Sequence, residues 1–139
     1  MSSERLWSPA FINYGVSSGI FYMTQYVLVA ALPIILTAEL GGTALDAGLA
    51  MTYFQIGTIL CRPFAGRLID GLDKRIILLI SSALFFVIME LFNLTTSLQT
   101  IFVLRGLHGA IFALGTTVMA ALAVVVLPAS RKGEGINMF

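Results

Sequence analysis

The stretch Gly66-Arg67-Leu68-Ile69-Asp70-Gly71-Leu72-Asp73-Lys74-Arg75 decides the fold class of this chain, because it is a short charged turn between two long apolar segments. The chain has 139 residues, of which 58% are hydrophobic and only 11% are charged. A soluble domain carries about 25% charged residues, so this chain lacks the side chains that a water-facing surface requires. We therefore expect a membrane protein that is surrounded by the lipid bilayer.

Four apolar segments are each long enough to cross a bilayer as a helix, which takes about 20 residues. We expect helices rather than strands, because the apolar runs show no alternation of period two and lipid does not tolerate an open sheet edge. The predicted fold class is an all-α membrane protein with four transmembrane helices, which form a single membrane segment over residues 1–139. The expected spans are residues 11–36, 44–69, 76–94 and 100–127.

The basic residues predict the orientation of the chain. Of the eight lysines and arginines, all except Arg105 fall on one side of the expected membrane, and the opposite side carries only Glu39 and Asp46. Because short basic loops stay in the cytoplasm, we expect both termini to be cytoplasmic. The protein is then a multi-pass protein of the cell membrane, either a bacterial inner membrane or a plasma membrane. The cytoplasmic basic residues are Arg5, Arg62, Arg67, Lys74, Arg75, Arg131 and Lys132.

The charged turn resembles the motif A loop of the major facilitator superfamily, which reads roughly Gly-x-Leu-Ala-Asp-Arg-x-Gly-Arg-Arg/Lys between the second and third spans. Gly66, Leu68 and Asp70 match this pattern, and Lys74 and Arg75 supply its basic end. The resemblance implies the N-terminal part of a twelve-helix transporter fold made of inverted repeats. It also implies a conformational latch formed by Gly66, Asp70, Lys74 and Arg75. In this latch Gly66 lets two helices approach closely, and Asp70 faces the positive end of a helix in the other half.

Two positions of the turn depart from the motif A pattern. Gly71 replaces a basic residue, and Asp73 replaces a turn glycine. Aspartate tolerates a left-handed backbone better than most residues, so we expect the turn to form. The lost basic residue leaves the charge network of the family incomplete. The alternative is a solvated turn whose charges only set the topology.

An arginine lies inside the fourth span, where it costs about 2.5–3.5 kcal/mol on insertion scales and therefore needs a partner. The segment around Arg105 resembles motif B of the same family, in which Arg105 and Gly109 match and His108 stands where glutamine is common. At helical spacing Arg105, Gly109, Phe112 and Thr116 fall within about 60° on one face. In proton-coupled members this arginine tunes an acidic group. The alternative is a structural arginine that bonds to backbone carbonyls.

Glu90 is the only acidic residue deep in an expected span. The third and fourth spans form a hairpin that turns near Thr96, which places Glu90 and Arg105 at depths that differ by about 5 Å. We expect the two side chains to interact, and we group Glu90 with Arg105 and Gly109 as candidate coupling or cavity residues. Separate partners, or a peripheral carboxyl group, are the alternatives.

Polar residues form a stripe along the first span. Asn13, Ser17 and Thr24 lie within about 40° of one another on a helical wheel, whereas Gly15 and Gly19 lie opposite as a helix-packing surface. We expect one side of this helix to face a cavity and the other to press on a neighbour, with hydrogen bonding between helices as the alternative. The candidate substrate-cavity residues are Asn13, Tyr14, Ser17, Thr24, Gln25, Phe112 and Thr116.

The sequence offers no set of residues for other kinds of chemistry. The single histidine, His108, has no Cys, Asp or Glu at ligand spacing in its helix, so we expect no metal site. No nucleophile with a base and an orienting group is visible, so we do not expect an enzyme, and nothing predicts a cofactor. The net charge of +1 predicts no nucleic-acid partner.

We expect transmembrane transport of a small, lipophilic molecule, as proton-coupled efflux by the N-terminal fragment of a major facilitator transporter. Under this interpretation the chain stops before span five, and its main partner is the missing C-terminal transporter half. Two alternatives stay open. One is a four-span structural or regulatory membrane subunit. The other is a small dimeric multidrug exporter, although such proteins carry an acidic residue in span one, and residues 11–36 contain none.

Overall fold

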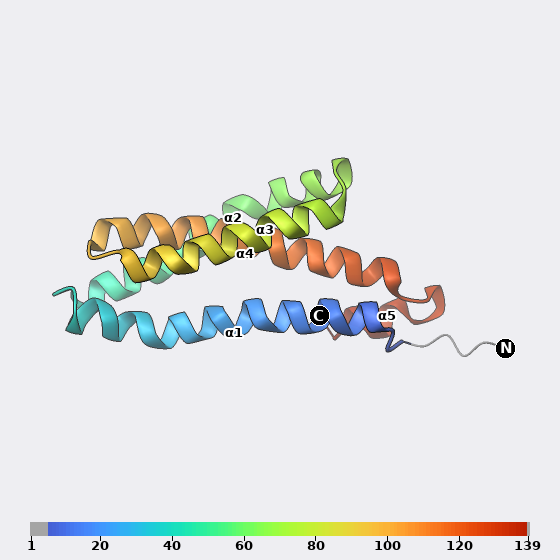
Figure 1. The fold of residues 1–139 in the computed structure, drawn as a ribbon, viewed down its shortest axis with the longest axis horizontal. Coiled ribbons are helices and arrows are strands. Elements are labelled where there is room, and N and C mark those ends of the chain that lie inside the picture. Colours follow the sequence, from blue (N-terminus) through green and yellow to red (C-terminus); the bar gives the residue numbers. More distant parts are fainter. Residues whose placement is uncertain (1–5, 139) are drawn as a thin grey trace.

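The computed structural model describes residues 6–138 and consists of helices (Figure 1). Four of these helices are long and apolar enough to cross a membrane, which confirms the predicted all-α class with four spanning helices. Their ends lie within two residues of those of the expected spans, and α4 ends one residue before the expected limit. The elements are α1 (Pro9–Ala38), α2 (Ala44–Gly71), α3 (Lys74–Leu94), α4 (Leu98–Val126), the 3-10 helix η1 (Ala129–Arg131) and α5 (Lys132–Ile136).

Side-chain caps fix where the first two helices begin. The hydroxyl of Ser8 accepts a hydrogen bond from the backbone N–H of Phe11 at 3.2 Å at the start of α1. At the start of α2, Thr43 and Asp46 form a reciprocal capping box, which satisfies two backbone donors that the helix leaves free. Between them Gly41 has a φ of 65°, a left-handed conformation that glycine adopts without steric cost.

Asp73 caps α3 and does not form the left-handed turn that its place in the motif suggests. Its φ is −64°, and its carboxylate accepts a hydrogen bond from the N–H of Arg75 at 2.8 Å. Lys74 closes the other side of the turn, because its Nζ donates to the carbonyl of Ile69 at 3.1 Å, near the end of α2. An aspartate therefore suits this position as a helix N-cap.

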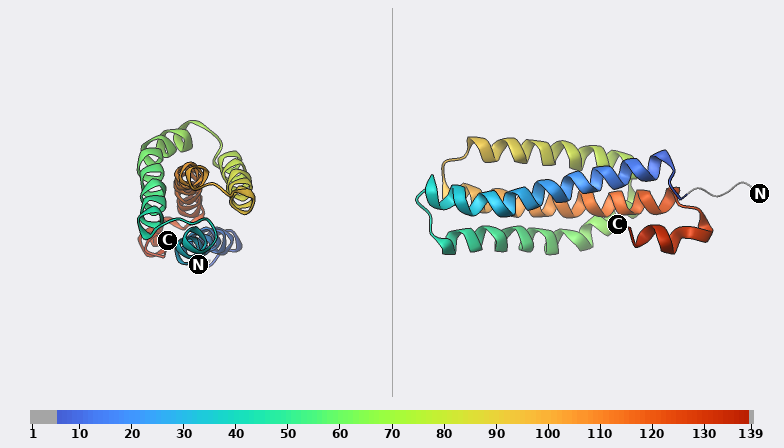
Figure 2. Two further views of the ribbon diagram at one scale, coloured as in Figure 1. Left: turned by 90° about the vertical axis from the view of Figure 1, so that its left-hand side faces the viewer. Right: turned by 90° about the horizontal axis from the view of Figure 1, so that it is seen from below.

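Helix α4 lies at the centre of the bundle, with the other three spanning helices around it (Figure 2). Half of the residues in the most apolar stretch of α4 are buried, against 22% in the corresponding stretches of α1, α2 and α3. The α1 and α3 backbones stay apart, since none of their Cα atoms approach within 8 Å in the described residues. The stacked rings of Phe21 and Phe85, 4.2 Å between centroids, bridge these two helices.

Glycines bring α2 and α4 into backbone contact. A Cβ atom built on Gly57 would overlap the carbonyl oxygen of Gly106, and one built on Gly109 would overlap that of Phe54. Gly66, the glycine predicted to allow a close helix approach in the latch, makes no such approach within residues 6–138, because nothing lies within 4 Å of a Cβ built there. Its approach to a helix outside these residues stays a prediction. The close crossing lies farther from the charged turn, toward the middle of α2.

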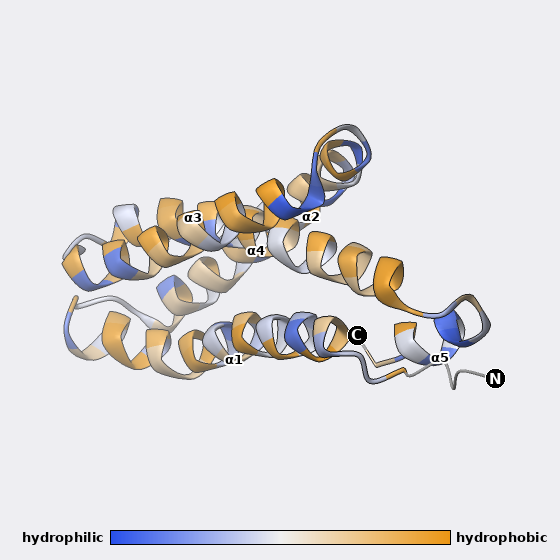
Figure 3. Cartoon of the chain, turned by 45° about the vertical axis from the view of Figure 1, so that its right-hand side comes forward, coloured by the Kyte–Doolittle hydropathy of each residue, from blue (hydrophilic) through white to orange (hydrophobic). Residues whose placement is uncertain are grey.

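Polar residues gather at the helix ends, whereas apolar residues run along the spans (Figure 3). The start of α1, the turn between α2 and α3 and the short α5 lie at one end of the bundle, and the other two turns lie at the opposite end (Figure 1). The described basic residues of the loops thus share one end. Arg5, which also counted toward the predicted orientation, lies outside the described residues.

Candidate functional site

The bundle centre holds a fully buried arginine, Arg105, which contacts three helices. Its Nη1 donates to Oε1 of Gln25 on α1 at 3.2 Å, and its Nη2 approaches the sulfur of Met51 on α2 at 3.3 Å. The guanidinium carbon lies 4.6 Å from the centroid of the Phe54 ring, a distance suited to a cation–π interaction. Arg105 therefore ties α1 and α2 to α4.

His108 completes this polar centre from the next turn of α4. Its Nδ1 lies 3.1 Å from Nη1 of Arg105. A guanidinium only donates hydrogen bonds, so Nδ1 must be the acceptor, and the ring is the neutral tautomer with its proton on Nε2. Neither that Nε2 nor Nε of Arg105 has a hydrogen-bond partner within residues 6–138. The centre thus presents two buried N–H donors without acceptors.

Phenylalanine rings enclose the His108 side chain. The centroids of Phe54 and Phe85 both lie 5.1 Å from that of the imidazole, and those of Phe92 and Phe112 lie at 6.1 and 6.3 Å. These rings come from α2, α3 and α4, and they keep water away from the polar groups. A low-dielectric enclosure strengthens each electrostatic interaction inside it and raises the cost of an unpaired charge.

The predicted pair of Glu90 and Arg105 is wrong. Glu90 is exposed on α3, and the ion pair found in the described residues joins Arg131 and Glu134 at 2.8 Å. The hairpin sets the depths of the two side chains but not the direction in which each points. Glu90 lies about 180° around α3 from the buried Ser81, so its carboxylate faces away from α4.

The residues of the predicted polar stripe of α1 lie in several different environments. Gln25 reaches Arg105, as described above, whereas Thr24 donates back to the carbonyl of Ile20 at 2.9 Å. Ser17 lines a groove near α3, Tyr14 packs half-buried against two apolar clusters, and Asn13 is exposed. The stripe is therefore not one cavity wall.

The glycine face of α1 does not press on a neighbouring helix of the described chain. Gly19 is exposed, and nothing lies within 4 Å of a Cβ built on it. Gly15 is half-buried and borders a pocket that Trp7 also lines. The predicted division of α1 into a cavity side and a packed glycine side is thus wrong within this bundle. The buried face of α1 carries larger residues such as Phe21 and Leu32.

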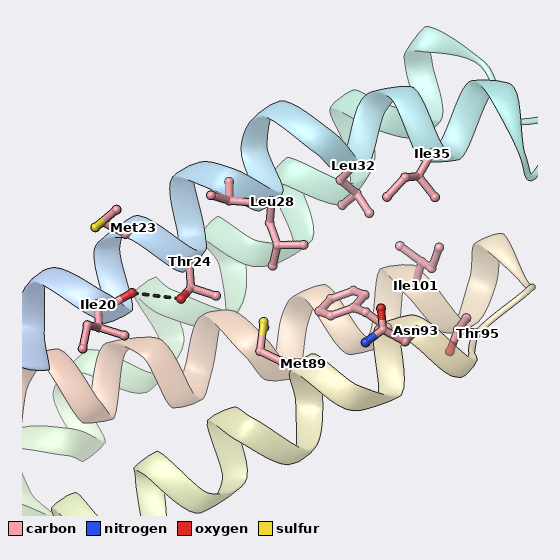
Figure 4. Close-up of a pocket in the computed structure, with 12 residues that line it drawn as sticks. Ile20, Met23, Thr24, Leu28, Leu32, Ile35, Met89, Asn93, Thr95 and Ile101 are labelled. Carbon is pink, nitrogen blue, oxygen red and sulfur yellow. Dashed lines mark hydrogen bonds between the residues drawn. The ribbon is translucent and has the colours of Figure 1, made fainter.

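A pocket of about 570 Å³ lies between α1 and α3, where the two backbones stay apart (Figure 4). Ile20, Leu28 and Leu32 of α1 face Met89 of α3 across it, and Ile101 of α4 closes one part. The Thr24 hydroxyl is engaged by its own helix, so the wall is mainly apolar. Such a pocket suits the hydrophobic body of a small molecule. Sequence reasoning missed most of these residues because each is an ordinary apolar residue of a span.

A smaller pocket of about 300 Å³ lies between α1, α2 and α4. Thr116, a predicted cavity residue, lines it together with Ser18, Tyr22 and Arg62. The Thr116 hydroxyl donates to the carbonyl of Phe112 at 2.8 Å, and the Phe112 ring meets that of Tyr22 edge-on at 5.1 Å. Phe112 therefore lies between this pocket and the Arg105 centre.

The predicted latch residues lie around the turn after α2. Asp70 and Arg75 are exposed, and Lys74 is half-buried against the end of α2. The Asp70 carboxylate forms no hydrogen bond or ion pair with any residue between 6 and 138. Its carboxylate is thus accessible at the end of the bundle that carries the basic loops.

Comparison with known proteins gives one match. The family model of the Major Facilitator Superfamily matches residues 14–139, which include nearly all of α1 and the whole of the other helices. No curated protein and no solved structure matches the chain. The family consists of membrane transporters rather than enzymes, which agrees with four spanning helices around a buried arginine. This chain therefore belongs to the Major Facilitator Superfamily.

Proposed function

We propose that the chain is the N-terminal part of a proton-coupled exporter of small, lipophilic molecules. The observation that carries this proposal is the buried Arg105 beside the apolar pocket between α1 and α3. A charge inside a spanning helix is costly and marks transport pathways by default. Here a space that fits the body of a small molecule is lined by Phe92, whose ring also packs against His108, the neighbour of the charge.

Proton coupling is proposed to involve the contact between Arg105 and His108. Within the described residues, Arg105 is the one charged or titratable group that contacts His108, whose other neighbours are phenylalanine rings. Protonation of Nδ1 would replace the hydrogen bond by two like charges 3.1 Å apart. Proton uptake by His108 is therefore coupled to movement of Arg105 or to arrival of a negative charge. Glu90 takes no part, because its carboxylate points outward.

We propose further that transport requires a second membrane segment. Alternating access moves one part of such a transporter against another. The resemblance of the charged turn to motif A gives Asp70 a helix end in the other half as its partner, and within this bundle its carboxylate is unpaired. The surface of α1 around the exposed Gly19, where a Cβ meets nothing within 4 Å, offers a second place at which a further helix fits closely.

Transport in everted membrane vesicles tests these proposals. The chain would be expressed alone and together with the polypeptide encoded immediately downstream. A pH gradient would then drive accumulation of small naphthalene derivatives, which serve as lipophilic test substrates. We expect accumulation only with both polypeptides, and its loss when the gradient is collapsed. Gradient-driven accumulation by the 139-residue chain alone would refute the two-part proposal, and no accumulation with both polypeptides would refute the transport proposal.

A further inference from the structure

We infer that the buried centre formed by Arg105 and His108 binds the anionic group of an amphiphilic substrate, whose apolar body occupies the pocket between α1 and α3. This inference rests on the proposed transport function and names its substrate class, a lipophilic organic anion. It concerns binding, so it is testable apart from transport.

The charge at the centre is uncompensated. Arg105 is 0% exposed, and no carboxylate contacts it within residues 6–138. Its partners are an amide oxygen, a thioether sulfur and an imidazole nitrogen, all of which are neutral. A buried charge without a counter-charge is unfavourable, so the centre attracts an anion and repels a cation.

The unpartnered atoms at the centre are donors. Nε of Arg105 carries a proton at all times, and Nε2 of His108 carries one because Nδ1 accepts from Arg105. Both atoms are buried and lack an acceptor. Two N–H donors next to a positive charge match the oxygens of a carboxylate, sulfonate or phosphate group. A ligand that only donates hydrogen bonds would leave them unsatisfied.

One aromatic ring separates the apolar pocket from this centre. Phe92 lines the pocket and meets the His108 ring edge-on at 6.1 Å between centroids. Ile101 lines the pocket one helical turn before Arg105, and Thr24 lines it one residue before Gln25. A ligand body in the pocket therefore places an attached anionic group near the two donors once the Phe92 side chain turns aside.

Lipid phosphate is another source of the same anionic chemistry. Arg105 lies seven residues inside the start of α4, which places it about 10 Å from that helix end. This depth favours a small molecule that enters through the pocket over a headgroup at the membrane surface. Nanodiscs of phosphatidylcholine, with and without added phosphatidylglycerol, distinguish the two sources.

Equilibrium binding to the 139-residue chain in nanodiscs tests the inference with three probes of one shape. These are naphthalene-2-carboxylate, the neutral naphthalene-2-carboxamide and the cationic naphthalen-2-ylmethylammonium. We expect the carboxylate to bind at least about ten-fold more tightly than the carboxamide, because it forms charge-assisted hydrogen bonds, and the ammonium to bind most weakly. Equal affinities, or a preference for the cation, would overturn the inference.

Substitutions test whether Arg105 and His108 cause the preference for the carboxylate probe. Arg105→Gln should abolish the ten-fold advantage of the carboxylate, and His108→Phe should reduce it because the Nε2 donor is lost. His108→Gln retains an acceptor and a donor and should restore it. The control Arg67→Gln removes an exposed arginine on α2 and should change nothing. A preference that survives both Arg105→Gln and His108→Phe would place the anion elsewhere and refute the assignment.

Misfolding of a variant, displacement by lipid and failure of transport each have a defined consequence for the inference. If a buried variant fails to fold, the three probes on the unchanged chain still test the sign of the charge. If phosphatidylglycerol displaces the carboxylate, the centre takes lipid phosphate, and the substrate assignment is wrong. Because these measurements need neither a pH gradient nor a second polypeptide, failed transport leaves them valid. Transport of the cationic probe without anion binding would refute this inference and leave the proposed function standing.

Discussion

The substitution Gly109→Ala tests the close crossing of α2 and α4, on which the buried centre depends. The added methyl group would overlap the carbonyl oxygen of Phe54 and lie 2.9 Å from its carbonyl carbon and 3.0 Å from the Thr58 hydroxyl. Non-bonded carbon atoms prefer about 3.5–4.0 Å. Helices α2 and α4 must therefore move apart by about 1 Å, because the atoms in the way are mainly backbone atoms that have no rotamers.

The cost of this movement follows from the contacts that it disturbs. Inserting a methyl group into a packed core costs about 1–3 kcal/mol. The hydrogen bond from Thr58 to the Gly109 carbonyl, at 3.1 Å, adds about 0.6 kcal/mol if it is lost. The better helix propensity of alanine returns about 0.5–1 kcal/mol. We expect a net loss of about 2 kcal/mol, which is roughly a 30-fold change in the unfolding equilibrium.

Unfolding in mixed SDS and dodecyl maltoside micelles measures this change. Cys61 is the only cysteine in the chain and is half-buried on α2, one turn after Thr58. Its reaction with a maleimide reports unfolding of this part of α2. The matched control is Gly48→Ala, at a position of α2 where a Cβ meets nothing within 4 Å. Identical unfolding curves for the two variants would show that the glycine crossing is not as described.

Three further predictions concern single side chains. Thr58→Val removes the hydroxyl that bonds to Gly109 and should lower the unfolding free energy by about 0.6 kcal/mol, whereas Thr58→Ser should retain it in the same micelle assay. Asp73→Ala removes the N-cap of α3, which is worth about 1 kcal/mol, and should speed hydrogen exchange of the Arg75 amide; unchanged exchange would argue against the cap. Glu90→Gln should change the unfolding free energy by less than about 0.5 kcal/mol, and a larger loss would reveal a partner for the carboxylate.

The spanning helices could be predicted from the sequence because each depends on a property of a continuous segment. The apolar runs gave four spans, and the helices end within one turn of them, where Pro128 follows α4 and Thr43 caps α2. Arg105 could also be identified in advance, because a charge inside a span is costly wherever the helix packs. These statements need no knowledge of how one helix is rotated against another.

Rotation about the helix axis is the property that the sequence did not provide. It is set by packing against neighbours, and the wrong predictions share this origin. Gly66, Gly57 and Gly109 are equally small, and only the crossing of α2 with α4 decides which of them is needed within this bundle. Likewise, loop length placed Glu90 near the depth of Arg105, whereas the buried face of α3 turned its carboxylate outward.

His108 shows how a local signal was overlooked. It lies three residues after Arg105, a spacing at which two side chains of one helix meet. His108 has no acid, thiol or second imidazole at ligand spacing in its helix, but a neutral imidazole is also an acceptor for a guanidinium. The contact at 3.1 Å fixes the tautomer, and the tautomer turns the outer side of the ring into a donor.

The charge at the bundle centre also differs from the sum of the formal charges deep in the spans. Glu90 and Arg105 are the charged residues deep in the expected spans, and their formal charges cancel. The fold separates them, so the centre keeps its positive charge while the carboxylate lies outside. Such a centre requires an acceptor for Nε of Arg105 and Nε2 of His108, from a ligand or from another membrane segment. Binding of naphthalene-2-carboxylate to the chain alone and to the chain together with the second membrane segment separates these cases, because a segment that supplies the acceptor abolishes the preference for the anion.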